Sequence, residues 1–441
     1  MSQDELEERV STKQGRIAEI AKKYSDKPML SIAHNIDLEW LYSAYKRTRK
    51  DGALGVDGVS AEEYAKDLKG NLTSLLNRFK SGEYRAPAVR RIHIPKGKGN
   101  ETRPLGIPTF EDKILQRAVL MALNPIFEQD FFPFSYGFRE GRSAHQALEQ
   151  LRNDCTKLGG GWVIDLDIRK YFDSIDHSHF RDIFKQRVCD GVITRIIGKW
   201  LKAGVLDEGQ LWYNEAGTPQ GAVISPVMSN IFLHEVLDKW FIKDVSPRLK
   251  GKASMVRFAD DAVLVFERRE DALKVMDVLP KRFAKYKLAL HPEKTRLVQF
   301  VKPNRDDDEK PGSFTFLGFT LYWGVSRKGR ALIKWKTEKS RLARSIKAIH
   351  LWMKKNRHMK LGDQHKTLTK KIRGHYVYYG MTFNSRSLHC FHYQCVRSWH
   401  KWLCRRSRKN RLEWVRFSDL LKHYPLPLPK IYHSLWGKAL S

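Results

Sequence analysis

Apolar residues recur at helical spacing in long stretches of this chain. Within the first fifty residues they follow this spacing at Leu38, Leu41, Tyr42 and Tyr45, and Ala61–Phe79 has the same pattern. These stretches predict amphipathic helices, each with one face against a core.

Shorter stretches, with the patterns of strands, lie between the helical ones. Arg90–Pro95 alternates, Trp162–Ile168 and Met255–Phe266 are rich in β-branched and aromatic residues, and Phe110–Phe127 is helical. Interleaved strands and helices predict an α+β domain. Beyond Lys336 the pattern is helical again, so we expect a domain boundary within about ten residues of position 335.

Acidic residues interrupt two of these predicted strands. In the first, the period of two places Asp165 and Asp167 on one face, and the second is expected to be a hairpin with Asp260 and Asp261 at its tip. Carboxylates held together repel, and their pKa would rise unless a cation lies between them. Mg²⁺ prefers such oxygen ligands, and two ions about 3.5–4 Å apart can activate a hydroxyl and stabilise a leaving pyrophosphate.

An Asp-Asp pair alone is more often an ordinary β-turn, because Asp favours turns. Here, however, Phe258-Ala259-Asp260-Asp261 resembles the aromatic-x-Asp-Asp box of reverse transcriptases, in the form common among group II intron proteins. Asp167–Asp173 resembles the first palm motif of that family. The resemblance implies that Asp167, Asp260 and Asp261 are metal ligands, and that Phe172 excludes a ribose 2′-OH.

Further motifs follow in the order of the same family. Gly217–Gly221 with Ser225-Pro226 resembles the loop that packs on the incoming base pair, and Phe316–Phe319 resembles the primer grip. Gly55–Gly58 and Ser135–Arg139 resemble the N-terminal extension and the fingers and palm. The resemblance implies dNTP contacts at Lys96, Arg103, Phe172, Gln220 and Lys294, and primer or template contacts at Gly221, Leu317, Gly318 and Phe319.

The charge of the chain favours a polyanionic partner. Lys and Arg number 81 against 49 acidic residues, a formal net charge of +32. From Arg327 to Arg411 there are 25 Lys and Arg, and the only acidic residues are Glu338 and Asp363. Charge this one-sided favours nucleic-acid phosphates over a membrane. No apolar run is long enough to cross a bilayer, and five irregularly spaced cysteines indicate reduced thiols in the cytoplasm.

Aromatic and basic residues are mixed in the last third of the chain. Ile372–Gly380 and Trp399–Arg406 resemble the maturase-specific, or thumb, domain of group II intron proteins. The aromatic residues could stack on bases, but helical spacing favours a structural core. RNA binding is therefore predicted from the basic residues, at Lys354, Lys355, Arg373, Arg405 and Arg406.

A metal site or an endonuclease domain is not predicted near the C-terminus. The cysteines and histidines between His389 and Cys404 do not have the Cys-x₂-Cys spacing of a zinc site. The residues up to Ser441 also lack the Cys pairs of the endonuclease domain that ends many group II intron proteins. We therefore expect the class without an endonuclease.

Together these features predict a right-hand polymerase of reverse transcriptase type with a helical thumb. The expected divisions are an N-terminal extension with the start of the fingers over 1–90, fingers and palm over 91–325, a thumb over 336–410 and a short basic tail over 411–441 that could bind DNA. The resemblance implies copying of intron RNA onto a DNA primer with dNTPs and two Mg²⁺, and assistance in splicing. Two alternatives stay open: a maturase that only binds RNA, and a free-standing enzyme of antiviral defence or DNA repair.

Overall fold

The chain forms two compact units in a computed structural model. The first consists of Met1–Ala147 and Leu166–Leu297, and the second of Leu148–Asp165 and Val298–Ser441. No helix among the described residues is long and apolar enough to span a membrane. The structure describes residues 3–95, 102–207, 210–212, 216–217, 221–303, 311–406 and 412–435.

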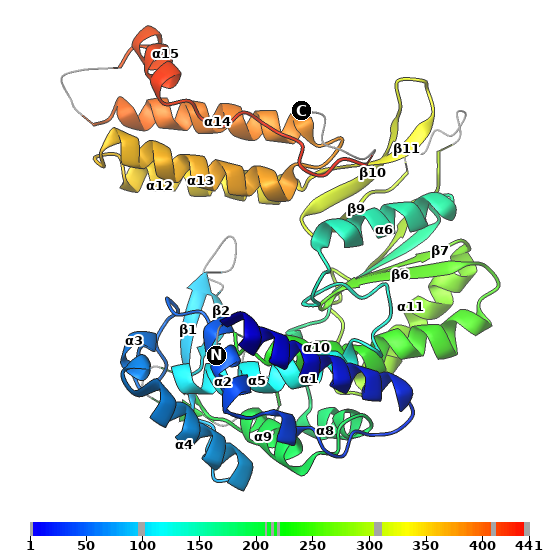
Figure 1. Ribbon diagram of the computed structural model, residues 1–441. Helices are drawn as coiled ribbons and strands as arrows, with labels where there is room; N and C mark the ends of the chain where they lie inside the picture. Colours follow the sequence, from blue (N-terminus) through cyan, green and yellow to red (C-terminus); the bar gives the residue numbers. More distant parts are fainter. Residues whose placement is uncertain are drawn as a thin grey trace. The chain divides into compact units, whose positions relative to one another are not determined.

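Helices at the N-terminus of the first unit pack on a central helix (Figure 1). α1 (Gln3–Lys23) and α2 (Leu38–Arg47) contact α5 (Phe110–Phe127). The fully buried Trp40 of α2 fixes this contact, because its indole N–H donates to the carbonyl of Ala118 at 2.9 Å. The helix predicted around Leu38–Tyr45 is confirmed, and α5 has the predicted bounds. The single helix predicted over Ala61–Phe79 is instead divided into three shorter helices, because Asp67 caps a new helix that begins at Leu68.

A four-stranded sheet of the first unit has the order β2-β1-β4-β5. β1 (Val89–Pro95) pairs antiparallel with β2 (Thr102–Ile107) and parallel with β4 (Val205–Asp207), and β4 pairs antiparallel with β5 (Gln210–Trp212). The strand predicted at Arg90–Pro95 is thus confirmed.

The remaining elements of the first unit include the acidic hairpin, in which β6 pairs antiparallel with β7. Asp261 is the first residue of β7 rather than part of the loop, so the predicted tip is shifted by one residue. The bounds are α3 (Ala61–Tyr64), η2 (Ala65–Asp67), α4 (Leu68–Ser81), α7 (Tyr171–Ser174), α8 (His177–Lys185), α9 (Gly191–Leu201), α10 (Ser225–Leu233), η3 (His234–Lys239), η4 (Phe241–Val245), η5 (Ser246–Arg248), β6 (Ala253–Phe258), β7 (Asp261–Phe266) and α11 (Arg269–Ala284). A short helix η1 (Ala33–Asn35) precedes α2.

Three elements lie where the sequence passes from one unit to the other: α6 (Ala144–Lys157), β3 (Trp162–Leu166) and β8 (Arg296–Gln299). β3 has the predicted alternation, with Ile164, Leu166 and the following Ile168 buried. The carboxylates of Asp165 and Asp167 are partly exposed.

The second unit contains a three-stranded antiparallel sheet and a group of helices. β9 (Phe314–Phe316), β10 (Phe319–Val325) and β11 (Ala331–Thr337) form the sheet, with β10 in the centre. The boundary expected near residue 335 falls inside β11. The helices are α12 (Lys339–Lys355), α13 (Leu361–Tyr379), α14 (Ser385–Leu403) and α15 (Trp414–His423).

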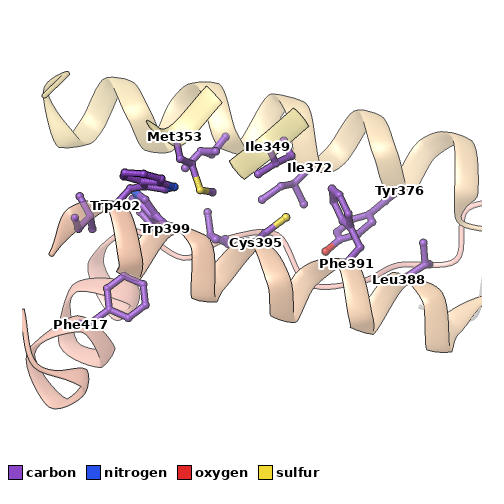
Figure 2. Packing of buried hydrophobic residues seen from close by; sticks show 13 residues of the cluster. Ile349, Met353, Ile372, Tyr376, Leu388, Phe391, Cys395, Trp399, Trp402 and Phe417 are labelled. Carbon is purple, nitrogen blue, oxygen red and sulfur yellow. The ribbon is translucent and has the colours of Figure 1, made fainter. Parts of the chain in front are cut away.

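Aromatic side chains form the core of these helices, and Figure 2 shows them pointing between the helices. Trp399 is fully buried, its indole donates to Gln364 at 3.0 Å, and Phe417 meets its ring edge-on. Tyr376, Phe391 and Trp402 are also buried. The prediction that most of these aromatics form a core is thus confirmed. The architecture as a whole is α+β with a C-terminal helical region, as expected.

Candidate active site

The acidic hairpin has a two-residue loop in a strained conformation. Phe258 pairs with Asp261, so Ala259 and Asp260 are the two central residues of the turn. Ala259 has φ +57°, whereas Asp260 is not left-handed. These signs are those of a type II′ turn, which usually has Gly at its first central position. An alanine there costs about 1–2 kcal/mol, so neighbouring contacts must stabilise the turn.

A buried network of charged and polar side chains contacts this turn. The Arg257 guanidinium is completely buried and donates to the two carboxylate oxygens of Asp238 at 2.7 and 2.5 Å. It also donates to the Asn230 side chain and to the Ala259 carbonyl, both at 3.0 Å. Burial alone would raise the pKa of Asp238, but the charge of Arg257, its hydrogen bonds and the nearby His234 together lower that pKa below its usual value.

The segment around Gly137 packs against the same turn. A Cβ atom at Gly137 would lie 2.2 Å from the amide nitrogen of Ala259, so only glycine permits this approach. The Asn230 amide donates to the Gly137 carbonyl at 2.7 Å. Arg257 exchanges backbone hydrogen bonds with this segment, donating to Phe134 and accepting from Tyr136.

Asp167 follows β3 and is fixed through its backbone. Its amide N–H donates to the Thr295 hydroxyl at 3.3 Å, and its carbonyl accepts from the amide of His291 at 2.8 Å. The Lys294 ammonium donates to a carboxylate oxygen of Asp167 at 3.3 Å. The two predicted site residues Asp167 and Lys294 therefore form an ion pair.

Tyr171 links the neighbourhood of Asp167 with that of the hairpin. Its buried hydroxyl donates to the carbonyl of Ser229 on α10 at 2.8 Å, next to Asn230. Burial raises the pKa of Tyr171, and the charge of Asp260 raises it further. The segment that follows Asp167 and the acidic hairpin therefore both form hydrogen bonds with α10.

Phe172, the predicted gate, is buried beside the start of the glycine-rich loop. Its ring meets that of Tyr171 at 5.4 Å. A Cβ at Gly217 would lie 3.0 Å from Cα of Asp173 and 3.1 Å from the carbonyl of Phe172, so the loop begins against the backbone of this residue. Gly217 has φ +96° and accepts from the His177 ring at 2.7 Å.

The far end of the same loop contacts β2. A Cβ at Gly221 would lie 2.7 Å from the side chain of Leu105. The following residues are anchored because the Gln116 side chain accepts from the amides of Val223 and Ile224, at 2.8 and 3.3 Å. Gln116 in turn donates to the carboxylate of Asp112 at 2.8 Å.

Three predicted dNTP contacts cannot be placed. Lys96 and Gln220 lie outside the described residues. Arg103 is on β2, where its backbone pairs with Ile94, but its side chain is not among those described. Their assigned roles stay predictions.

The predicted primer grip is a second strained turn, in the second unit. Leu317 and Gly318 both have positive φ, +49° and +79°, directly before β10 begins at Phe319. The Tyr378 hydroxyl of α13 donates to the Leu317 carbonyl at 2.9 Å. A Cβ at Gly318 would lie 3.1 Å from the Tyr379 hydroxyl.

The predicted RNA-binding residues differ in their surroundings. The side chains of Lys354, Lys355, Arg373 and Arg405 are exposed. Arg406 is partly buried and donates to the carbonyls of Arg357 and Met359, so it also connects the end of α14 to the turn between α12 and α13.

The donor chemistry of the acidic residues fits a divalent cation, although their arrangement is not that of a ready metal site. Carboxylate oxygens are ligands that Mg²⁺ prefers. The carboxylate of Asp167 already pairs with a cation, because the Lys294 ammonium donates to it. Within the described ranges, however, no three His, Cys, Asp or Glu side chains are gathered closely enough to hold a metal ion. This includes the described cysteines and histidines of α14. The two-Mg²⁺ site therefore stays a prediction.

Some residues of this site were not predicted from the sequence. Arg257 stands between apolar residues of a predicted strand, and such a charge inside an apolar strand is a signal that could have been used. Asp238 and Asn230 lie in a helical stretch, where nothing in the local pattern marks them.

Comparisons with known proteins assign the family. Residues 94–321 match the family described as Reverse transcriptase (RNA-dependent DNA polymerase). Protein YkfC of Escherichia coli (strain K12) is 33% identical over 356 residues, which is 71% of this chain and 89% of YkfC. Group II intron-encoded protein LtrA of Lactococcus lactis subsp. cremoris is 36% identical over 203 residues, 46% of this chain and 33% of LtrA. Nuclear intron maturase 4, mitochondrial, of Arabidopsis thaliana is 24% identical over 223 residues, 50% of this chain and 25% of that protein.

The chain therefore belongs to the reverse transcriptase family. It is an RNA-directed DNA polymerase, which extends a primer along a nucleic-acid template with dNTPs, and its family uses divalent metal ions.

Proposed function

We propose that Asp167, Asp260 and Asp261 are the catalytic carboxylates of this polymerase and hold two Mg²⁺ ions. Three observations support this. All three residues belong to the first unit, Asp167 has a cationic partner, and the Asp260 charge acts on Tyr171 four residues beyond Asp167. The strained turn that carries Asp260 is the observation on which the proposal chiefly rests, because such strain is common at functional sites.

In this proposal each group of the chain has a separate role. The bound ions would neutralise charge at the triphosphate and activate the primer 3′-hydroxyl. Lys294 holds Asp167 and provides a positive charge near the leaving pyrophosphate. Lys96, Arg103 and Gln220 bind the incoming nucleotide, and the turn at Leu317 and Gly318 positions the primer strand. Positioning and charge neutralisation supply most of the rate enhancement.

Replacement of Asp261 by Asn tests the carboxylates. Primer extension on an RNA template with Mg²⁺ should fall by at least ~10³-fold, because metal binding is lost with little change in side-chain volume. RNA binding should persist, since it depends on the basic surface. Asp277→Asn is the matched control, because Asp277 is an exposed carboxylate on α11 that pairs with the equally exposed Lys281 at 3.0 Å. Normal extension by the Asp261 variant would refute the assignment, and parallel loss of RNA binding would undermine the separation of the two activities.

Phe172→Ala tests the nucleotide gate. Removal of the ring should relax discrimination against ribonucleotides by about 10–100-fold, because the space for a 2′-OH opens. The measurement is competition between dNTP and rNTP in primer extension. Unchanged selectivity in a variant that still folds would contradict the gate.

For the biological setting we propose a free-standing group II-like reverse transcriptase, acting in defence or DNA repair. The support is the extent of the match to YkfC, which covers 89% of a protein whose name mentions no intron. The match to the intron-encoded LtrA covers only 33% of that protein. Intron RNA domains on both sides of the gene would contradict this setting.

An intron-encoded polymerase that also assists splicing is the second candidate. LtrA is described as intron-encoded, and the second unit combines an aromatic core with exposed basic residues suited to RNA. In this case the protein would accelerate splicing of its own intron RNA, and the Asp261→Asn variant would retain that activity. A protein that only binds RNA is not supported, because the chain is an RNA-directed DNA polymerase by family.

A further inference from the structure

We propose that Arg257 is a positioning residue for catalysis: it fixes the orientation of the Ala259–Asp260 peptide and thereby the direction of the Asp260 carboxylate. This inference rests on the proposed role of Asp260 and Asp261. It adds a residue that does not itself touch metal or substrate.

The central peptide of the hairpin loop has two alternative orientations. Type I′ and type II′ turns differ by a flip of the peptide between the two central residues, and the flip changes the sign of φ at the second. Here that residue is Asp260, and Asp tolerates the left-handed region better than most residues. The sequence of the turn alone therefore permits either form, and the two forms aim the Asp260 side chain differently.

Arg257 contacts the atom that moves in this flip. Its Nη1 donates to the Ala259 carbonyl, the oxygen of the central peptide, at 3.0 Å. In the flipped form this hydrogen bond would be lost, and a completely buried guanidinium would lose one of its acceptors. The contact thus favours the form in which Ala259 is left-handed and Asp260 is not.

The guanidinium is itself held in a fixed position. Asp238 accepts from it in a bidentate manner, and Asn230 accepts from the same Nη1. Asp238 lies on η3, a π-helical segment that continues α10, and such segments are frequent at functional sites. A planar fork of donors can satisfy these acceptors at once, whereas a lysine ammonium cannot reproduce the geometry.

Stability alone does not account for a buried ion pair at this place. Buried ion pairs are often no more stabilising than apolar residues of similar volume, because both charges lose their hydration. The pair contacts the peptide that carries Asp260, so its burial is better explained by the need to hold this peptide in one orientation. Displacement of a catalytic group by about 1 Å can cost ~10²-fold in rate.

Arg257→Lys tests the proposal, with Arg187→Lys as the matched control. Arg187 is also buried, pairs with Asp130 at 2.7 Å and donates to the carbonyls of Ala21, Tyr24 and Lys27, but none of these belongs to the hairpin. Each variant is compared with the wild type in single-turnover primer extension across a Mg²⁺ titration, and its unfolding is followed in parallel.

Both variants should lower the melting temperature, but only Arg257→Lys should affect catalysis specifically. We expect its rate at saturating dNTP to fall about 100-fold and its half-saturating Mg²⁺ concentration to rise severalfold, while Arg187→Lys stays within about threefold of the wild type. Equal losses in both variants, or a normal Mg²⁺ dependence in Arg257→Lys, would overturn the proposal.

Two further variants keep the result interpretable. If Arg257→Lys does not fold, Asn230→Ser tests the proposal instead, because it removes the side-chain acceptor that helps to hold the Arg257 guanidinium. The half-saturating Mg²⁺ concentration should rise in this variant too, but by less. No change in that concentration would refute the role of the network. Asp261→Asn in the same assay separates the hypotheses. If it remains active, the site assignment itself is wrong. If it is inactive and Arg257→Lys is normal, only the positioning role fails.

Discussion

The turns at Ala259 and Leu317 both have a non-glycine residue in the left-handed region, and they are stabilised differently. At Ala259 in the first unit the carbonyl accepts from a buried guanidinium, and at Leu317 in the second it accepts from the Tyr378 hydroxyl. The first turn carries carboxylates, so a cationic donor also offsets their charge. The second belongs to a unit rich in Lys and Arg, where a neutral donor suffices.

The same difference extends to the interiors of the two units. In the first unit, charged groups such as Asp112, Asp238 and Arg257 are buried in hydrogen-bonded networks. In the second, the helices bury aromatic rings and place their basic residues on the surface. The buried charged groups of the first unit hold particular backbone and side-chain positions. In the second unit, an apolar core supports helices whose basic residues lie on the surface.

The largest effect is expected from the aromatic scaffold. Trp399→Ala should destabilise the second unit by about 3–5 kcal/mol, because it creates a large cavity and leaves Gln364 without its indole donor. Urea unfolding measures this loss. Val415→Ala is the control, as Val415 is 73% exposed and should change stability by less than about 0.5 kcal/mol. Similar losses in both variants would show that the aromatic cluster is not the core of this unit.

One buried group in each unit should change its contribution to stability in opposite directions as the pH falls. Burial raises the pKa of Asp112 in the first unit to about 6, and burial lowers the pKa of His375 in the second to about 4. Between pH 6 and 4 Asp112 binds an extra proton in the folded state, so its contribution to stability rises as pH falls. His375 binds an extra proton in the unfolded state between pH 6.5 and 4, so its contribution falls. Each effect is about 3 kcal/mol at most.

Neutral replacements isolate these two contributions. The stability difference between wild type and Asp112→Asn should grow in favour of the wild type from pH 6 to pH 4. The difference between wild type and His375→Gln should change in the opposite direction between pH 6.5 and 4. Unfolding followed at several pH values measures both, and the same sign of change for the two sites would contradict the comparison.

Removal of one hydroxyl should have a smaller effect at the second turn. Tyr378→Phe removes the donor to the Leu317 carbonyl and should cost about 1 kcal/mol. If this turn grips the primer, the apparent affinity for primer–template should weaken several-fold, while the Mg²⁺ dependence stays normal. Tyr393→Phe is a control, because Tyr393 is 56% exposed on α14. An altered Mg²⁺ dependence in the Tyr378 variant would erase the distinction between the two turns.

The sequence predicted the family, the α+β class and the positions of the acidic segments, because these depend on local patterns. Alternation identified β3, and apolar spacing identified α5 with its bounds. The exact hairpin loop differs by one residue, since register depends on pairing rather than on composition.

Contacts between distant segments could not be predicted. Nothing local to Asp238 or Asn230 indicates that they meet Arg257, and nothing near Tyr378 indicates a hydrogen bond to Leu317, 61 residues earlier. The roles of Arg406 were also hidden, because a basic residue in a basic segment gives no sign that it binds backbone carbonyls. Tertiary geometry decides which charges are structural.

The smallest expected effect separates surface charge from structural charge within the second unit. Joint replacement of the exposed Lys354 and Lys355 by Ala should weaken RNA binding with little change in stability. The slope of log K against log salt concentration should become shallower by about 0.7 for each phosphate contact that is lost. Arg406→Ala should instead lower stability by about 1–2 kcal/mol, because two hydrogen bonds to the carbonyls of Arg357 and Met359 are lost. Lys281→Ala, an exposed position of the first unit, is the control for nonspecific charge loss. Since counterion release depends on phosphate contacts alone, an unchanged salt slope in the double variant would place the RNA on another face.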